Sequence, residues 1–350
     1  MPQPKSASDI TRERDNLAIS YYFNALEVQD PNGKILSRPR KGLTASAISN
    51  LRAAKTEENL GLSVFQVTYP NVVPNPAEYP LTRIYGPNVE LTASGSFTVP
   101  DGYSDFELHL WGGGGVVATY SGTGAYVTGT FSTSPGNSFN VAVNAGRGIG
   151  RDGRNGGGYT GIYRGTNTQA NYIAVAGGGG SACSYGGSYK VGGGATWSGT
   201  AYQGGVDGTS QRSTAANLSG GVDSFNESGG GASQTQGGES GFYGPGPGTA
   251  LKGADGSNQP DNAQPGQTFA AGGGGGWFGG GGGGRTYYTT AAGGGGSSYT
   301  GGIQNASGED GSTGGGSPGG TRTKFYAPGY GGVNQGGRCV VVFYKFGSVV

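Results

Sequence analysis

The stretch from Gly272 to Gly296 constrains the fold of this chain more than any other feature. It contains runs of five, six and four glycines, interrupted by Trp277-Phe278 and by the segment from Arg285 to Ala292. Such a stretch has few side chains to bury, and glycine loses more conformational freedom on ordering than any other residue. The segment is therefore either disordered or held by hydrogen bonds between its own backbone and neighbouring backbone.

Composition decides between these two states. The chain has 80 glycines and 17 prolines in 350 residues without a Gly-X-Y register, which is typical of disorder. Aromatic residues nevertheless make up 11% of the chain, including 21 tyrosines, whereas disordered chains are poor in aromatics. We therefore expect folded segments of polyproline-II type, which have three residues per turn and no internal hydrogen bonds. Glycine lets such helices lie side by side and bond to one another.

The distribution of glycine divides the chain. Six glycines precede Trp111 and 74 follow it, so we expect a boundary near residue 93. The predicted fold class is mainly β and irregular, with a small β framework carrying a large glycine-rich insertion of packed polyglycine-II helices, preceded by a small α+β module. The predicted domains are an N-terminal attachment module at 1–69, a proline-rich neck at 70–93 and a glycine-rich head at 94–350. The insertion is expected at 146–337.

Local patterns predict individual elements. In the N-terminal module, Asp30-Pro31-Asn32-Gly33 predicts a hairpin, residues 44–55 a helix and residues 62–69 a strand. In the head, Phe106, Leu108 and Leu110 alternate with Glu107, His109 and Trp111, as on the two faces of a strand. Further strands are expected at 125–131, 139–143 and 338–346, with a turn at 134–137. We expect the lone histidine, His109, to be a strand residue at a surface or interface without a catalytic role.

Several classes of function find little support. The net charge is +1 and lysines and arginines do not cluster, so the sequence does not predict a basic surface for binding nucleic acid. The longest apolar run, Val340 to Tyr344, is too short to span a membrane. Cys183 and Cys339 have no CxxC spacing or accompanying histidines, so no metal site or cofactor is expected. The GxGxxG match at 148–153 is not followed by a helix pattern, which argues against nucleotide binding.

Arginines 147, 151 and 154 are more typical of a solvated loop than of an anion site. The first residues do not read as a signal peptide, which predicts synthesis in the cytoplasm without processing. We therefore expect a protein that is not an enzyme.

A series of motifs resembles a known family. It comprises Phe97-Thr-Val-Pro-Asp-Gly, Phe106-Glu-Leu-His-Leu-Trp-Gly-Gly-Gly-Gly, the runs near Gly156 and Gly177, Gly272 to Gly284, and the terminal Cys339-Val-Val-Val-Phe-Tyr. This pattern, over about residues 95–346, is similar to the glycine-rich domain family, which includes the tip adhesins of phage tail fibres. In that family a β framework carries a lattice of polyglycine helices, and loops between the helices present aromatic residues. The receptor branch of the family does not fit, because its many cysteines are missing here.

The resemblance implies a structural or binding protein exposed on a virion, such as a fibre, spike or tip that binds a host receptor. Aromatic residues in loops are the predicted partner-binding residues, namely Trp197, Tyr202, Phe242, Tyr243, Tyr287 and Tyr288. Trp277 and Phe278, between two glycine runs, are expected to pack instead. Residues 1–92 are expected to bind other virion proteins. The alternatives are a minor capsid or cement protein without a receptor role, and a non-viral glycine-rich adhesive or ice-binding protein.

Overall fold

The computed structural model describes most of the glycine-rich region and two short strands nearer the N-terminus. The residues described are 28–29, 35–36, 82–117, 119–185, 188–199, 201, 205–206, 228–241, 244–257, 270–284 and 291–347. The chain forms two units, Met1–Thr82 with Ser348–Val350 and Arg83–Gly347. No α-helix occurs within the described ranges, which contain β-strands and two 3-10 turns at Arg151–Gly153 and Gln169–Asn171.

The larger unit contains a five-stranded sheet in the order β13-β6-β5-β14-β3. Its strands are β3 (Thr82–Leu91), β5 (Asp105–Trp111), β6 (Tyr126–Ser132), β13 (Gln304–Glu309) and β14 (Arg338–Gly347). The pairs β5·β6, β5·β14 and β6·β13 are antiparallel. The last described strand of the chain thus lies inside the sheet, between β5 and the edge strand β3.

A second sheet of four strands has the order β4-β7-β8-β9 and is antiparallel throughout. Its strands are β4 (Gly95–Thr98), β7 (Ser138–Ala145), β8 (Tyr159–Tyr163) and β9 (Tyr172–Ala176). The two sheets share one hydrophobic core, so they form a β-sandwich. Phe97 and Phe139 of the second sheet surround Phe106 of the first, with ring centroids 5.7 and 5.3 Å from its own.

Strand alternation and turn chemistry predicted part of this sandwich correctly. Phe106, Leu108 and Leu110 point into the shared core, and the strands expected at 125–131, 139–143 and 338–346 correspond to β6, β7 and β14. The expected turn at 134–137 is closed by a 3.2 Å hydrogen bond from the Asn137 N–H to the Ser134 carbonyl.

Other strands lie where the sequence predicted none. Thr82–Leu91, assigned to the proline-rich neck, forms β3 at an edge of the five-stranded sheet. An edge strand tolerates Pro87, because a residue without an N–H is excluded mainly from the middle of a sheet. Strands β8, β9 and β13 belong to the stretch described as a glycine-rich insertion, so the β framework draws part of itself from within that stretch.

Two small sheets complete the described strands. The antiparallel pair β1 (Val28–Gln29) and β2 (Ile35–Leu36) confirms the hairpin predicted around Asn32-Gly33. Strands β10 (Cys183–Tyr185), β11 (Ser188–Val191) and β12 (Gly205–Val206) form an antiparallel sheet in the larger unit. The helix predicted at 44–55 and the strand predicted at 62–69 lie outside the described residues.

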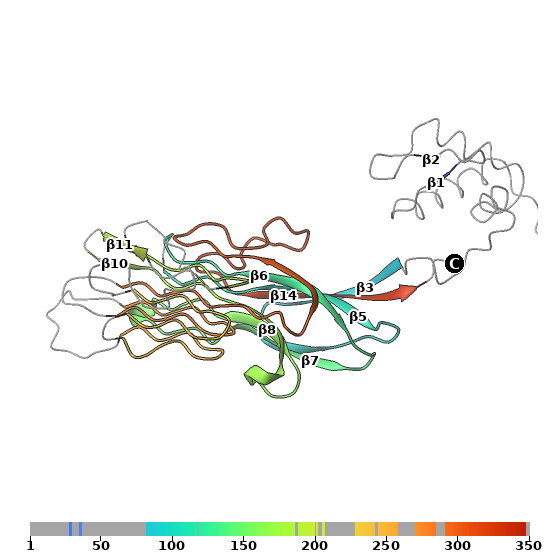
Figure 1. Cartoon of the computed structure of the whole chain (residues 1–350), viewed down its shortest axis with the longest axis horizontal. Helices are drawn as coiled ribbons and strands as arrows, with labels where there is room; N and C mark the ends of the chain where they lie inside the picture. The colour runs from blue at the N-terminus through green and yellow to red at the C-terminus, as the bar shows by residue number, and fades with distance from the viewer. Residues whose placement is uncertain are drawn as a thin grey trace, which may run out of the picture. The chain divides into compact units, whose positions relative to one another are not determined.

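The glycine runs continue directly from the ends of the sandwich strands. Gly112 follows β5, Gly177 follows β9, and Gly158 immediately precedes β8. Figure 1 shows these segments lying side by side beyond one end of the two sheets, within the Arg83–Gly347 unit. We call this assembly of segments the glycine lattice, and its runs are Gly112–Gly115, Gly177–Gly180, Gly272–Gly276, Gly279–Gly284 and Gly293–Gly296 with the segments bonded to them.

Backbone hydrogen bonds in the glycine lattice repeat every three residues. Along one run the N–H groups donate in order to four carbonyls: Gly178 to Gly275, Gly179 to Gly113, Gly180 to Gly193 and Ser181 to Gly272, at 2.8 to 3.1 Å. The first and fourth bonds reach the same neighbouring run, and the two between them reach two other segments. The same spacing recurs in other pairs: Gly112 to Ala125 with Gly115 to Gly122, Gly280 to Gly274 with Gly283 to Ala271, and Gly293 to Ser181 with Gly296 to Gly178. Each such run is therefore hydrogen-bonded to several neighbours around its axis.

Glycine is needed in these runs because the segments approach one another closely. None of the glycines in the five runs has a positive φ, so an L-residue could adopt their backbone conformation. A Cβ at Gly274 would instead overlap the carbonyl of Gly178, and a Cβ at Gly281 would overlap the carbonyl of Glu239. Because the obstructing atoms are backbone, they cannot rotate away as a side chain would.

Candidate functional site

The glycine lattice has one end against the sandwich and one end away from it. At the sandwich end, the Trp277 ring stacks on Tyr299 with centroids 4.0 Å apart, and Tyr299 forms a β-bridge with Val175 of β9. Trp277 also packs against the buried cluster of Tyr159 and Tyr172. Trp277 thus packs, as expected for the pair between two glycine runs.

The opposite end is defined by five residues, which we call the lattice tip: Gly241, Ser257, Ala271, Gly283 and Ala291. Their hydrogen bonds run from Ser257 to Gly283, from Gly283 to Ala271 and from Ala271 to Ala291, at 2.8 to 3.1 Å, while Gly241 donates to Gly282 at 2.9 Å. In sequence, Phe242 and Tyr243 come directly after Gly241, and Tyr287 and Tyr288 lie between Gly284 and Ala291. Two of the three predicted aromatic pairs are therefore covalently attached at neighbouring points of one end of the lattice.

The remaining predicted residues are placed differently. Trp197 is half-buried and packs against the sandwich core, and its backbone N–H donates to Asp310 Oδ1 at 3.0 Å. Tyr202 follows Ala201, whose N–H donates to Ala232. Tyr202, Phe242, Tyr243, Tyr287 and Tyr288 themselves lie outside the described residues, so their partner-binding role stays a prediction.

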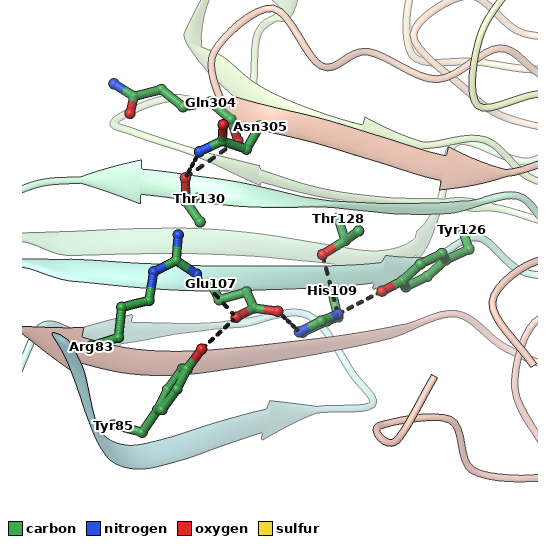
Figure 2. A network of polar contacts seen from close by, with 9 residues as sticks. All are labelled: Arg83, Tyr85, Glu107, His109, Tyr126, Thr128, Thr130, Gln304 and Asn305. Carbon is green, nitrogen blue, oxygen red and sulfur yellow. Dashed lines mark hydrogen bonds and ion pairs between the residues drawn. The ribbon is translucent and has the colours of Figure 1, made fainter. Parts of the chain in front are cut away.

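A second candidate is a polar network on the outer face of the five-stranded sheet, shown in Figure 2. Glu107 on β5 accepts a 3.5 Å hydrogen bond from the Tyr85 hydroxyl and lies 3.8 Å from the Arg83 guanidinium, both on β3. Its other oxygen lies 3.1 Å from His109 Nε2, which is within ion-pair distance but not aligned as a hydrogen bond. One carboxylate thus links β3 and β5 across β14.

The network continues from His109 to β6 and β13. His109 Nδ1 lies 2.6 Å from the Tyr126 hydroxyl and 3.3 Å from Thr128 Oγ1. Nearby, Thr130 Oγ1 donates to the Gln304 carbonyl at 3.3 Å and accepts from Asn305 Nδ2 at 3.2 Å, which ties the edge strand β13 to β6. Sequence reasoning did not find this network, because its members come from strands that are distant in the chain.

His109 is buried, with 4% of its surface exposed, so the expectation of a surface position is wrong. The segment 320–330 covers this part of the sheet, and the Phe325 ring lies 4.3 Å from the imidazole, centroid to centroid. Alternation placed His109 correctly on the face opposite Leu108 and Leu110, but it gave no sign of a covering segment more than 200 residues later.

Burial and charge set the chemistry of this network. Contact with His109 is the largest cause that lowers the pKa of Glu107, with the charges of Arg83 and Lys324 adding to it and burial opposing it. Burial raises the pKa of Tyr126 to about 12. At neutral pH the network therefore contains an ionised carboxylate and a neutral phenol that is a poor nucleophile, an arrangement suited to joining strands.

The cysteines and the arginines near residue 150 do not form a recognisable binding site. Cys183 and Cys339 are both buried, and burial raises the pKa of Cys339. Arg147 and Arg151 are exposed, as expected for a solvated loop, whereas Arg154 is half-buried and does not fit that expectation. In the described part of the chain, no three His, Cys, Asp or Glu side chains gather as a metal ion would require, and no helix is long and apolar enough to cross a membrane.

Comparison with known proteins finds no family whose model matches this chain and no curated protein of significantly similar sequence.

Proposed function

We propose that this chain is a viral structural protein exposed on the virion, as a fibre, spike or tip, and that its glycine lattice presents loops to a host receptor. The glycine-rich segments would be polyglycine-II helices packed in parallel and antiparallel contact. The three-residue hydrogen-bond period supports this assignment, because such a helix has three residues per turn and directs successive N–H groups to different neighbours. The close backbone contacts that exclude any Cβ support it as well.

The proposed receptor-binding role rests on the lattice tip. Neighbouring lattice segments end there, and the residues that follow them in sequence include Phe242, Tyr243, Tyr287 and Tyr288. A scaffold fixed by backbone bonds is suited to holding variable segments at one end, since those bonds do not depend on the side chains of the segments that follow. Tyrosine gives a large contact area with few rotatable bonds to freeze, which is why it is common in binding loops.

The same proposal assigns the N-terminal part to attachment. Residues preceding β3 would bind other virion proteins, and the chain would be made in the host cytoplasm and incorporated into the particle. A role as a cement protein, with the same attachment but no receptor, remains the competing function.

The test is binding of the full chain to host cells and immobilised glycans. Changing Tyr287 and Tyr288 together to alanine should weaken binding about tenfold or more, because a central aromatic contact contributes about 2 kcal/mol. The thermal unfolding temperature should stay nearly unchanged. The control is Ile84→Ala, which removes an exposed apolar side chain from the five-stranded sheet and should leave cell binding intact.

Two results would count against this function. A loss of stability with binding intact would show that Tyr287 and Tyr288 pack within the head. Normal incorporation into particles without binding to any host cell would favour the cement role.

A further inference from the structure

Exposed apolar side chains are concentrated at one place in the larger unit. In the described residues, the large hydrophobic side chains that are exposed are Ile84, Tyr85, Tyr120, Ile149 and Phe346. Ile84, Tyr85 and Phe346 belong to β3 and β14, which are neighbours in the five-stranded sheet. Tyr85 is 50% exposed and Phe346 is 45% exposed.

Tyr85 and Phe346 are connected through the ring of Tyr344, which is itself buried, with 2% of its surface exposed. Their rings contact Tyr344 at centroid distances of 6.0 and 5.5 Å. The Arg83 guanidinium lies 4.7 Å from the centre of the Tyr344 ring, and the Lys324 ammonium lies 5.6 Å from that of Tyr85. We call these five residues, Arg83, Tyr85, Lys324, Tyr344 and Phe346, the cationic aromatic patch.

We propose that the cationic aromatic patch binds an acidic protein surface that carries an apolar or aromatic anchor. Glu107, the carboxylate in contact with the patch, is only 24% exposed and lies 3.8 Å from Arg83, and it also interacts with the charge of Lys324. One carboxylate therefore faces two cations, and the patch keeps a net positive charge. Exposed Arg322 on the same covering segment adds positive charge nearby. A partner with carboxylates around an apolar side chain would complement both the charge and the rings.

Charge also argues against a second copy of this chain as the occupant. A two-fold interface places a patch against itself, so Arg83 and Lys324 would face the same cations of the other copy. Backbone pairing along the edge of β3 is disfavoured too, because Pro87 interrupts the row of N–H donors. The contact is therefore made by side chains of the outer face, with a partner of opposite charge.

The patch lies on the two strands that lead out of the described unit. β3 begins at Thr82 and β14 ends at Gly347, so both connections to the rest of the chain start from this pair of strands, whereas the lattice tip lies beyond the other end of the sheets. The patch is thus separate from the proposed receptor-binding tip, and the two can be tested independently.

The probe is a random copolymer of glutamate and tyrosine, labelled for fluorescence anisotropy and titrated with the full-length chain. The wild-type chain should bind it, more weakly as salt rises. Phe346→Ser and Lys324→Glu should each weaken binding roughly tenfold, since each removes an exposed element of the patch. The matched controls are Ile149→Ser and Arg151→Glu, exposed residues on the glycine lattice, which should bind as the wild type does. Lys324→Gln is the second variant, because it removes the charge without reversing it, and circular dichroism checks that each variant is folded.

Four results would overturn the proposal. The first is no binding of the copolymer by the wild-type chain, and the second is an equal effect of the patch and control substitutions. The third is tighter binding of single-stranded DNA or phosphatidylserine vesicles, which would assign the patch to another class of partner. The fourth is a dimer in sedimentation that Phe346→Ser dissociates, which would make a second copy the occupant.

Discussion

Substitution of Gly281 tests whether close backbone packing stabilises the glycine lattice. Its N–H donates to Gly230 at 2.8 Å, and its carbonyl accepts from Gly294 at 2.9 Å. A Cβ added at this position would overlap the Glu239 carbonyl and lie 3.0 Å from the Gly230 nitrogen. Because all of these obstacles are backbone, a larger residue must push neighbouring segments apart and break their hydrogen bonds.

The size of the effect follows from these contacts. Overpacking a close-packed interior costs about 1–3 kcal/mol. Leaving buried backbone groups unpaired costs about 1–3 kcal/mol for each group. With at least one bond lost, Gly281→Ala should lower the free energy of unfolding by about 3 kcal/mol or more, and Gly281→Val by more still. For a unit of this size that corresponds to a fall in Tm of roughly 6–12 °C.

Thermal unfolding followed by circular dichroism measures this fall. The control is Gly336→Ala, because a Cβ at Gly336 meets only Asn144 Nδ2 at 3.9 Å, an ordinary contact, and Gly336 has no positive φ. The control should raise stability by about 0.4–1 kcal/mol, the effect of replacing glycine by alanine where the new side chain fits. Equal Tm values for Gly281→Ala and Gly336→Ala would refute the argument from close packing.

Three further predictions concern the sheets. The pKa of Tyr126 is raised from 10 in the unfolded chain to about 12, so its contribution to stability is complete below pH 10 and is lost as the pH rises to 12. Two pKa units correspond to about 3 kcal/mol, so the free energy of unfolding of Tyr126→Phe should fall less steeply with pH in this range than that of the wild type. The pKa of Glu107 is lowered, so its contribution is present above the ordinary carboxyl pKa of 4.5 and lost as the pH falls below it; acid unfolding of Glu107→Gln should depend less on pH. Deleting residues 1–81 should leave a folded head that no longer enters particles. Deleting residues 1–92 also removes β3 and should lower the Tm of the head itself. If the chain lacking residues 1–81 still enters particles at normal copy number, the attachment role is contradicted.

The sequence predicted those strands and turns of the sandwich that have a local pattern, such as alternation or turn composition. β5 shows strict alternation of large and polar residues, and Ser134-Pro135-Gly136-Asn137 has the composition of a turn, so both were found. β3 was missed because its Gly86-Pro87 pair reads as a connector. β13, with the sequence Gln-Asn-Ala-Ser-Gly-Glu, has no apolar face to bury and is held by pairing with β6.

The candidate sites were harder to predict, because they depend on which distant segments come together. The charge pattern of β5 shows that Glu107 and His109 share a face, but Arg83, Tyr126 and Phe325 reach them only through strand order and the covering segment. The lattice tip is similar: glycine runs indicate close packing, but only the hydrogen bonds show which runs end together. Trp197 lies in a loop, as predicted, but its half-buried ring packs against the core, which the sequence did not indicate.

The hydrogen bonds of the glycine lattice also determine how this chain can fold. Gly114 donates to Gln335 and Gly124 to Gly331, partners that are separated by more than half of the chain. Bonds to near neighbours, such as Gly115 to Gly122 and Gly280 to Gly274, satisfy only part of a run, and its other groups need partners that are distant in sequence. Forming these distant pairs costs the entropy of closing long loops. During synthesis, the first glycine runs therefore emerge long before their last partners, and the lattice is completed only when the C-terminal residues leave the ribosome. We expect such a protein to fold slowly, in one late cooperative step, and to tolerate almost no truncation at its C-terminus.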